Sequence, residues 1–251
     1  MVDYHASTGS WSTNLSTPDR VLSIGAHPDD AEIGAGGTLA KWAAAGSHIT
    51  ILVITDGSKG TWDPDTSSEA LTIDRLEEQR NAADTLGVID LVNLGHVDGE
   101  LEYLMALREE ICFHIRRTRP VVVLAHDPWR RYMLHPDHRA AGWAAIDGVV
   151  AARDHLFFPN QLRDDIRHHR PGALLLWAPD EPDHWEDVDG FIDRKVDALL
   201  QHSSQSGTTM QGAGHHTGAT SGFRADITAR AEAATGPTNF AAAEAFKLIV
   251  P

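Results

Sequence analysis

Cysteine is almost absent from this chain, and positive charge is scarce. Its 251 residues include one cysteine, and 21 lysines and arginines stand against 36 aspartates and glutamates, a formal net charge of −15. A single cysteine excludes an intramolecular disulfide and a metal site made of cysteines alone. A chain this acidic would have to bind nucleic acid against its own electric field, so we expect no nucleic-acid partner.

Long hydrophobic runs are also missing. No stretch approaches the roughly 18 apolar residues of a transmembrane helix, and the first residues lack the basic start and apolar segment of a secretion signal. We therefore expect a soluble, cytoplasmic protein without a membrane partner. Cys112 lies on the apolar stripe of an expected helix, where a role in the core is the simplest interpretation.

What the chain does contain is a series of short runs rich in valine, isoleucine and leucine, separated by segments with apolar residues at helical spacing. Apolar runs of this kind are typical of parallel strands covered on both faces. We expect strands at residues 20–24, 48–55, 89–94, 120–125 and 173–177. We expect helices at residues 33–45, 69–86, 101–117 and 136–153. The pattern predicts a single α/β domain over residues 1–251, a Rossmann-like layer sandwich with a mostly parallel sheet.

Two segments fall outside this alternation. Residues 203–221 are rich in Ser, Thr, Gly and His without apolar periodicity, which favours a loop over the site. Residues 239–250 have the spacing of a short amphipathic helix.

Polar side chains gather where the expected strands end. His27, Asp29 and Asp30 follow the first strand, and Asp98 and His126 follow the third and fourth. Open parallel sheets place their sites in the crevice beyond the carboxyl ends of the strands. We therefore expect these side chains to meet at one edge of the sheet.

Two histidine-aspartate clusters, "HPDD" at residues 27–30 and "HPDH" at residues 135–138, could form a metal site. A metal hydrolase needs three protein ligands, an open position and a carboxylate that takes a proton from water. The residues alone do not decide whether Asp29 or Asp30 binds the metal. The alternative for "HPDD" is a helix capped by aspartate after a proline turn.

The glycines at positions 34, 36 and 37 have two interpretations. A phosphate cradle is one, but a dinucleotide fingerprint needs G-x-G-x-x-G directly at the strand end, and His-Pro-Asp-Asp stands there. We expect instead that these glycines let the following helix lie close against the sheet.

Several motifs together resemble the PIG-L or LmbE-like family of zinc-dependent N-acetylglucosaminyl deacetylases. They are "AHPDDAEIGAGGTLA" at residues 26–40, "RLEEQRNAADTLGV" at residues 75–88, "NLGHVDGEL" at residues 93–101, "HPDH" at residues 135–138 and "HSSQ" at residues 202–205. The resemblance runs over most of the chain and implies an LmbE-like fold.

The resemblance also implies roles for individual residues. The implied zinc ligands are His27, Asp30 and His138. Asp29 would be the general base, His135 would face the developing oxyanion, in protonated form adding charge stabilisation, and Asp137 would orient a histidine. Fe²⁺ could occupy the same site in the cell.

For substrate binding, the resemblance implies Arg75 and Asp98, which would hold sugar hydroxyls. Arg75 has the alternative of a solvated helix face or an ion pair with Glu78, and Asp98 that of a turn residue in "DG". Family members often carry a glutamate near Ser58 and Lys59, so we expect a reshaped sugar pocket there. Tyr132 is not assigned a role.

The expected activity is the removal of the N-acetyl group from a small molecule that contains N-acetylglucosamine, with zinc-activated water. Three alternatives stay open: an amidase that cleaves a thiol-sugar conjugate, a non-catalytic sugar-binding relative, and a non-haem iron oxygenase, which also uses two histidines and a carboxylate. The extra carboxylate Asp29 has a task only in hydrolysis. A homo-oligomer is also left open.

Overall fold

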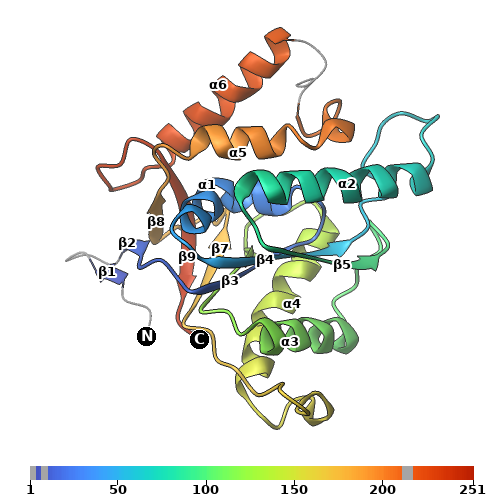
Figure 1. The fold of residues 1–251 in the computed structure, drawn as a ribbon, viewed down its shortest axis with the longest axis vertical. Coiled ribbons are helices and arrows are strands. Elements are labelled where there is room, and N and C mark those ends of the chain that lie inside the picture. Colours follow the sequence, from blue (N-terminus) through green and yellow to red (C-terminus); the bar gives the residue numbers. More distant parts are fainter. Residues whose placement is uncertain (1–3, 7–10, 211–216) are drawn as a thin grey trace.

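The computed structural model describes residues 4–6, 11–210 and 217–251. In these residues a central sheet lies between two layers of helices (Figure 1). Helices α1 (Asp30–Ala44), α2 (Ser68–Leu86), α5 (Ile192–Leu199) and α6 (Thr217–Ala233) lie on one side of it. Helices α3 (Met105–Thr118) and α4 (Pro136–Arg153) cover the other side. The predicted Rossmann-like α/β layer sandwich is confirmed.

The sheet of the described residues has nine strands in the order β1-β2-β8-β9-β7-β6-β3-β4-β5. Its parallel centre consists of β3 (Arg20–Gly25), β4 (His48–Thr55), β5 (Asp90–His96), β6 (Val122–His126) and β7 (Ala173–Trp177). The remaining strands are β1 (Tyr4–Ala6), β2 (Ser12–Leu15), β8 (His184–Asp187) and β9 (Ala243–Ile249). The strand order reverses between β3 and β6, and sites in such folds form at this reversal.

The central strands are buried on both faces. In β3, Val21 packs on the α1 and α2 side, whereas Leu22 packs on the α3 and α4 side. Ile51 and Leu52 of β4 divide in the same way. Because neighbouring residues point to opposite faces, both helical layers receive an apolar surface. This double burial is why the strands appear as continuous apolar runs. Cys112 is buried in α3, as expected.

The C-terminal half corrects two expectations. Residues 239–250 do not form a helix: β9 pairs antiparallel with both β7 and β8, and these backbone hydrogen bonds decide the conformation of a short apolar run that periodicity cannot assign. In the expected 203–221 loop, residues 203–205 form a 3₁₀ turn and residues 217–221 belong to α6, while residues 211–216 lie outside the described residues.

The glycines of α1 do lie against neighbouring elements. A Cβ atom on Gly34 would stand 2.5 Å from the ring of Trp177 in β7. Gly37 is similarly close to Val188, at 2.9 Å. Glycine therefore lets the start of α1 approach the sheet at the edge where the polar residues collect.

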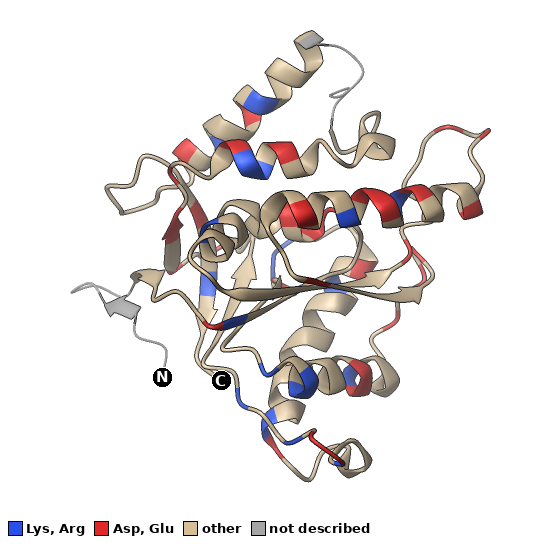
Figure 2. Ribbon diagram, viewed as in Figure 1, with Lys and Arg blue, Asp and Glu red and all other residues tan. Residues whose placement is uncertain are grey.

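The acidic excess is visible along α2, where Asp and Glu residues outnumber the arginines (Figure 2). None of the helices of the described residues has the length and apolar character needed to cross a membrane.

Candidate metal centre

The turn between β3 and α1 carries the first motif. Asp29 is the residue before α1 and has a left-handed backbone conformation, with φ of 95°. The backbone N–H of His27 donates to Asp30 Oδ2 at 2.7 Å. This turn sends Asp29 and Asp30 into different surroundings, although they are neighbours in the chain.

The second motif opens α4 and meets the first. His138 Nε2 lies 3.2 Å from His27 Nδ1 and 3.3 Å from Asp30 Oδ1. His27 Nδ1 lies 3.5 Å from Asp30 Oδ2. The structure thus brings His138 to His27 and Asp30, from which it is separated by more than a hundred positions in the sequence.

These separations fit a metal ion. Ligand atoms about 2.0–2.1 Å from a tetrahedral Zn²⁺ lie roughly 3.3 Å from one another. The observed distances are 3.2 Å between the two imidazole nitrogens, 3.3 Å from His138 to Asp30 Oδ1 and 3.5 Å from His27 to Asp30 Oδ2, so the two histidines approach different oxygens of one carboxylate. The described residues also contain overlapping groups with metal-binding geometry, among them His27 with His135 and His138, and Asp30 with His126 and His138. The site can therefore hold a metal ion.

The carboxylates around His27 favour a positive charge at the centre of these three residues. Burial alone would lower the pKa of His27, but the carboxylates of Asp137, Asp30 and Asp98 raise it to about 12. Burial alone would raise the pKa of Asp30, but His138 and His126 lower it well below its usual range. A cation satisfies this arrangement of carboxylates, and the donor set of imidazole and carboxylate suits zinc.

His27 is also held from its other ring nitrogen. His27 Nε2 lies 3.1 Å from Asp98 Oδ1 and 3.3 Å from Asp137 Oδ2. Asp137 is fully buried and accepts hydrogen bonds from the backbone N–H groups of Gly99 and Leu101, at 2.7 and 3.3 Å. Such carboxylate contacts fix the orientation of a ligating imidazole. Asp98, expected at the substrate, thus also faces a metal-ligand candidate.

A second positioning pair was not recognised in the sequence. Trp177 Nε1 donates to His126 Nδ1 at 3.1 Å, so His126 Nε2 carries the proton and donates to Asp30 Oδ2 at 3.0 Å. Burial lowers the pKa of His126, which keeps its ring neutral. His126 and Trp177 stand opposite each other in β6 and β7. His126 was expected at a strand end, but no motif in the sequence paired it with Trp177.

Asp29 lies on the other side of the turn, against α2. Its backbone N–H donates to Gln79 Oε1 at 2.9 Å. Arg75 donates to Pro28 O at 2.5 Å and lies 3.6 Å from Asp29 Oδ2. Burial raises the pKa of Asp29 to about 7, while Arg75 acts in the opposite direction. A carboxyl group with a pKa near neutrality is suited to general acid-base chemistry.

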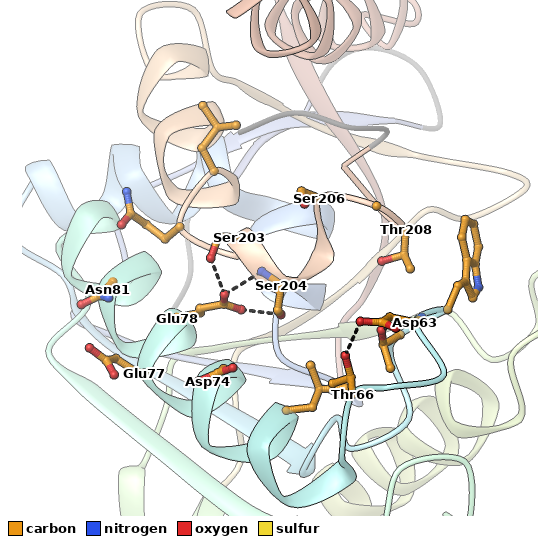
Figure 3. A pocket seen from close by; sticks show the side chains of 16 residues that line it. Asp63, Thr66, Asp74, Glu77, Glu78, Asn81, Ser203, Ser204, Ser206 and Thr208 are labelled. Atoms are coloured by element: carbon orange, nitrogen blue, oxygen red, sulfur yellow. Dashed lines mark hydrogen bonds between the residues drawn. The ribbon is translucent and has the colours of Figure 1, made fainter. Parts of the chain in front are cut away.

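Gln79 connects Asp29 to a further buried group. Its Nε2 donates to Glu32 Oε1 at 2.7 Å, and Glu32 Oε2 lies 3.9 Å from His202 Nε2. His202 and Glu32 are both fully buried. The next residues, Ser203 and Ser204, bind the carboxylate of Glu78 in α2 at 2.7 Å (Figure 3). The "HSSQ" segment thereby attaches to α2 behind the site.

His135 precedes α4, and its Nδ1 accepts from the backbone N–H of Asp137 at 3.3 Å. In a neutral ring the proton then belongs to Nε2. Burial, followed by His27 and His138, lowers the pKa of His135. The lowered pKa favours a neutral ring, which still offers one N–H donor. Tyr132 is 92 % exposed and lines none of the cavities described below.

A cavity of about 340 Å³ opens onto the metal-ligand candidates; most of its lining residues are polar or charged, and we call it the polar cavity. Its lining includes Trp62, Arg75, Asp98, His135 and Gln205. A larger cavity of about 880 Å³ shares Thr61, Trp62 and Thr208 with it (Figure 3). This second space is acidic, with Asp63, Asp74, Glu77 and Glu78 in its lining. Polar groups for a sugar therefore surround the approach to Asp29.

Comparison with known proteins gives consistent matches. The family profile described as "GlcNAc-PI de-N-acetylase" matches residues 22–149. Diacetylchitobiose deacetylase of Thermococcus kodakarensis is 38 % identical over 74 % of this chain and 70 % of its own length. A 1D-myo-inositol 2-acetamido-2-deoxy-alpha-D-glucopyranoside deacetylase of Kineococcus radiotolerans is 31 % identical over 55 % of this chain and 46 % of its own length. The solved structure of N,N'-diacetylchitobiose deacetylase from Pyrococcus horikoshii has a TM-score of 0.83 and 27 % identity, covering 93 % of this chain and 84 % of that chain.

Proposed function

Because this chain belongs to the PIG-L family of de-N-acetylases, we propose that it is a zinc-dependent hydrolase that removes the acetyl group from a small N-acetylglucosamine-containing compound. The observation that carries the proposal is the triangle of His27, Asp30 and His138 beside a separate buried carboxylate, Asp29. Metal ligands without a neighbouring base would support only the binding of a metal ion. Metal ligands together with the base Asp29 support hydrolysis.

His27 Nδ1, Asp30 and His138 Nε2 would hold the zinc. When bound there, the ion would polarise the acetyl carbonyl and make a water molecule more acidic. Iron, with related ligand preferences, is the alternative in the cell.

Asp29 would take a proton from the attacking water and later deliver it to the amine nitrogen as the carbon–nitrogen bond breaks. Its raised pKa favours both steps near neutral pH. His135 would donate Nε2–H to the acyl oxygen as negative charge develops there. Asp98 and Asp137 would keep His27 in place through its Nε2.

The polar cavity supports a sugar as the amine-bearing part of the substrate. Arg75 and Asp98 line it, as expected from the sequence, and Trp62, which is 81 % exposed, offers an indole face for a sugar ring. Arg75 also binds the Pro28 carbonyl, so it would position the base as well as contact substrate. Diacetylchitobiose and inositol-linked N-acetylglucosamine, named for the relatives, are the first candidates.

A substrate panel on zinc-reconstituted protein tests the proposal, with N,N'-diacetylchitobiose, an inositol-linked N-acetylglucosamine and a thiol-sugar amide as substrates. Equal release of acetate and free amine from one of the first two is the expected result. Release of a thiol-bearing acid from the third alone would favour the amidase alternative, and absence of any release would favour a sugar-binding protein. The cytoplasmic location and a homo-oligomer stay predictions, for cell fractionation and light scattering to check.

A further inference from the structure

Another cavity, whose lining is mostly different from that of the polar cavity, also reaches the metal-ligand candidates. It has a volume of about 420 Å³. Asp30, Ile33 and His138 line both this cavity and the polar one. His126 lines only the 420 Å³ cavity, whereas His27 and Asp29 line only the polar one. The two spaces therefore meet at the ligand triangle and approach it from different elements.

The lining of this second cavity is largely apolar. Its apolar members include Met133, Trp177, Pro179, Ile227, Ala231 and Ala234. Two of its charged side chains are paired within the described residues, Lys195 with Glu244 at 2.6 Å and Arg230 with Asp226 at 2.7 Å. Arg75 and Asp98, which are proposed to hold the sugar, line the polar cavity only.

An amide that reacts at the triangle must direct its amine part to one side and its acyl part to the other. The polar cavity suits the hydroxyl-rich amine part, which leaves the apolar cavity for the acyl part. An acetyl group would place a single methyl group there, which is about the size of a water molecule, or roughly 30 Å³. The cavity is more than ten times larger than that.

The charges around the two spaces agree with this direction. Hydrolysis of an amide releases a carboxylate from the acyl side and an ammonium ion from the amine side. Arg130 lines the apolar cavity in addition to the paired Lys195 and Arg230, whereas Asp63, Asp74 and Glu77 belong to the space that continues from the sugar side (Figure 3). Each product would leave through a region of opposite charge.

We propose that the 420 Å³ cavity is an acyl-chain pocket, and that the enzyme hydrolyses linear N-acyl groups longer than acetyl from amino sugars. This inference rests on the proposed function, because it takes the same triangle and the same base. Acyl groups of roughly four to eight carbons would fill about 120 to 240 Å³ at about 30 Å³ per carbon. The water oxygen forms the new bond to the acyl carbon, the carbon–nitrogen bond breaks, and the products are a fatty acid and the free amino sugar.

The test compares N-acetyl-, N-butanoyl- and N-hexanoylglucosamine conjugates that share one aglycone. Each buried methylene should raise kcat/KM by about fourfold, because apolar surface leaves water. Ala234→Trp would fill the pocket from the residue that follows α6. Ala233→Trp, at an exposed neighbouring position outside the lining, is the matched control. Ala234→Trp should lower kcat/KM for the hexanoyl substrate at least tenfold and for the acetyl substrate less than threefold, with Ala233→Trp near wild type.

Two further readouts keep the test decisive. Hexanoate should bind wild-type protein at least tenfold more tightly than acetate in calorimetry, and Met133→Trp in the loop before α4 should remove that preference even if Ala234→Trp fails to fold. Acetyl turnover with no cleavage of longer acyl groups would overturn the acyl pocket and leave the proposed function standing. No cleavage of any member would overturn both.

Discussion

Asp29 and Asp30 are adjacent in the chain, yet they lie in two regions with opposite effects on a carboxyl group. Asp30 faces His126 and His138, which lower its pKa well below the usual range although burial opposes them. Asp29 faces α2, where burial raises its pKa to about 7 against the effect of Arg75. One carboxyl group is kept charged, and the other can gain and lose a proton near neutral pH.

This difference indicates the task to which each aspartate is suited. A carboxylate held ionised beside two imidazoles is suited to a cation, while one with a pKa near 7 is suited to proton transfer. The sequence, read as residues alone, could not assign the two. The contacts of Asp29 with α2, and of Asp30 with His126 and His138, support the assignment that the family resemblance implied.

The most severe change expected is Asp30→Asn. Loss of the ligand charge would leave His27 and His138 without their shared partner, so both metal content and turnover should fall below detection. Metal analysis after gel filtration checks this, with His138→Ala as a second ligand variant. A fully loaded Asp30→Asn protein would show that Asp30 is not a ligand.

Asp29→Asn should separate the two regions most clearly. An amide cannot accept the proton, so kcat should fall by about 10² to 10⁴-fold while metal content stays at the wild-type level. The measurement is steady-state deacetylation together with metal analysis of the same sample. Near wild-type turnover would remove Asp29 from the role of base.

The region behind Asp29 should also be recognisable from its pH dependence. Burial lowers the pKa of His202 to about 3, so the unfolded chain binds a proton below pH 6.5 that the folded chain does not bind. His202 should therefore reduce the free energy of unfolding by about 2 kcal/mol between pH 7 and pH 5. Urea unfolding of wild type and His202→Gln at both pH values measures the difference, and an equal loss in both proteins would contradict it.

Gln79→Leu should disturb the position of Asp29 and leave zinc binding unchanged. It removes the acceptor of the Asp29 N–H and the donor to Glu32. We expect kcat to fall roughly tenfold at unchanged zinc affinity, as for other supporting residues. A variant with weaker zinc binding and normal turnover of the loaded enzyme would reverse the division between the two regions.

Trp177→Phe is the matching change on the metal side. Phenylalanine keeps an aromatic ring at this position but lacks the indole N–H that donates to His126 Nδ1. His126 would therefore be less firmly oriented toward Asp30. Zinc affinity should fall by up to about tenfold in competition with a chelator, with a smaller effect on kcat of the loaded enzyme. Unchanged affinity would indicate that packing alone orients His126.

The parts of the molecule set by local pattern were predictable from the sequence. The strands at 48–55 and 173–177 and the helix at 136–153 have the expected bounds, because apolar runs and a proline at the start of α4 define them locally. The prediction of a helix at residues 239–250 was wrong, because the conformation of β9 depends on pairing with β7 and β8, which lie far away in the chain. The loop expected at residues 203–221 was predicted too long, because residues 217–221 belong to α6, which packs against α5.

The candidate site shows the same division. His27, Asp30 and His138 were identifiable because each lies in a compact motif at a strand end or helix start. The partners Trp177 and Gln79 were not, because each meets the site only through folding and has no motif of its own. Residues that orient others carry little signal in a single sequence.

A crystal structure of the protein grown with zinc tests the central claim most directly. The account predicts an anomalous zinc peak within about 2.0–2.2 Å of His27 Nδ1, Asp30 and His138 Nε2, with Asp29 near the ion but outside its ligand set. A peak bound by Asp29 in place of Asp30, or an empty triangle in which the two imidazoles point apart, would contradict it.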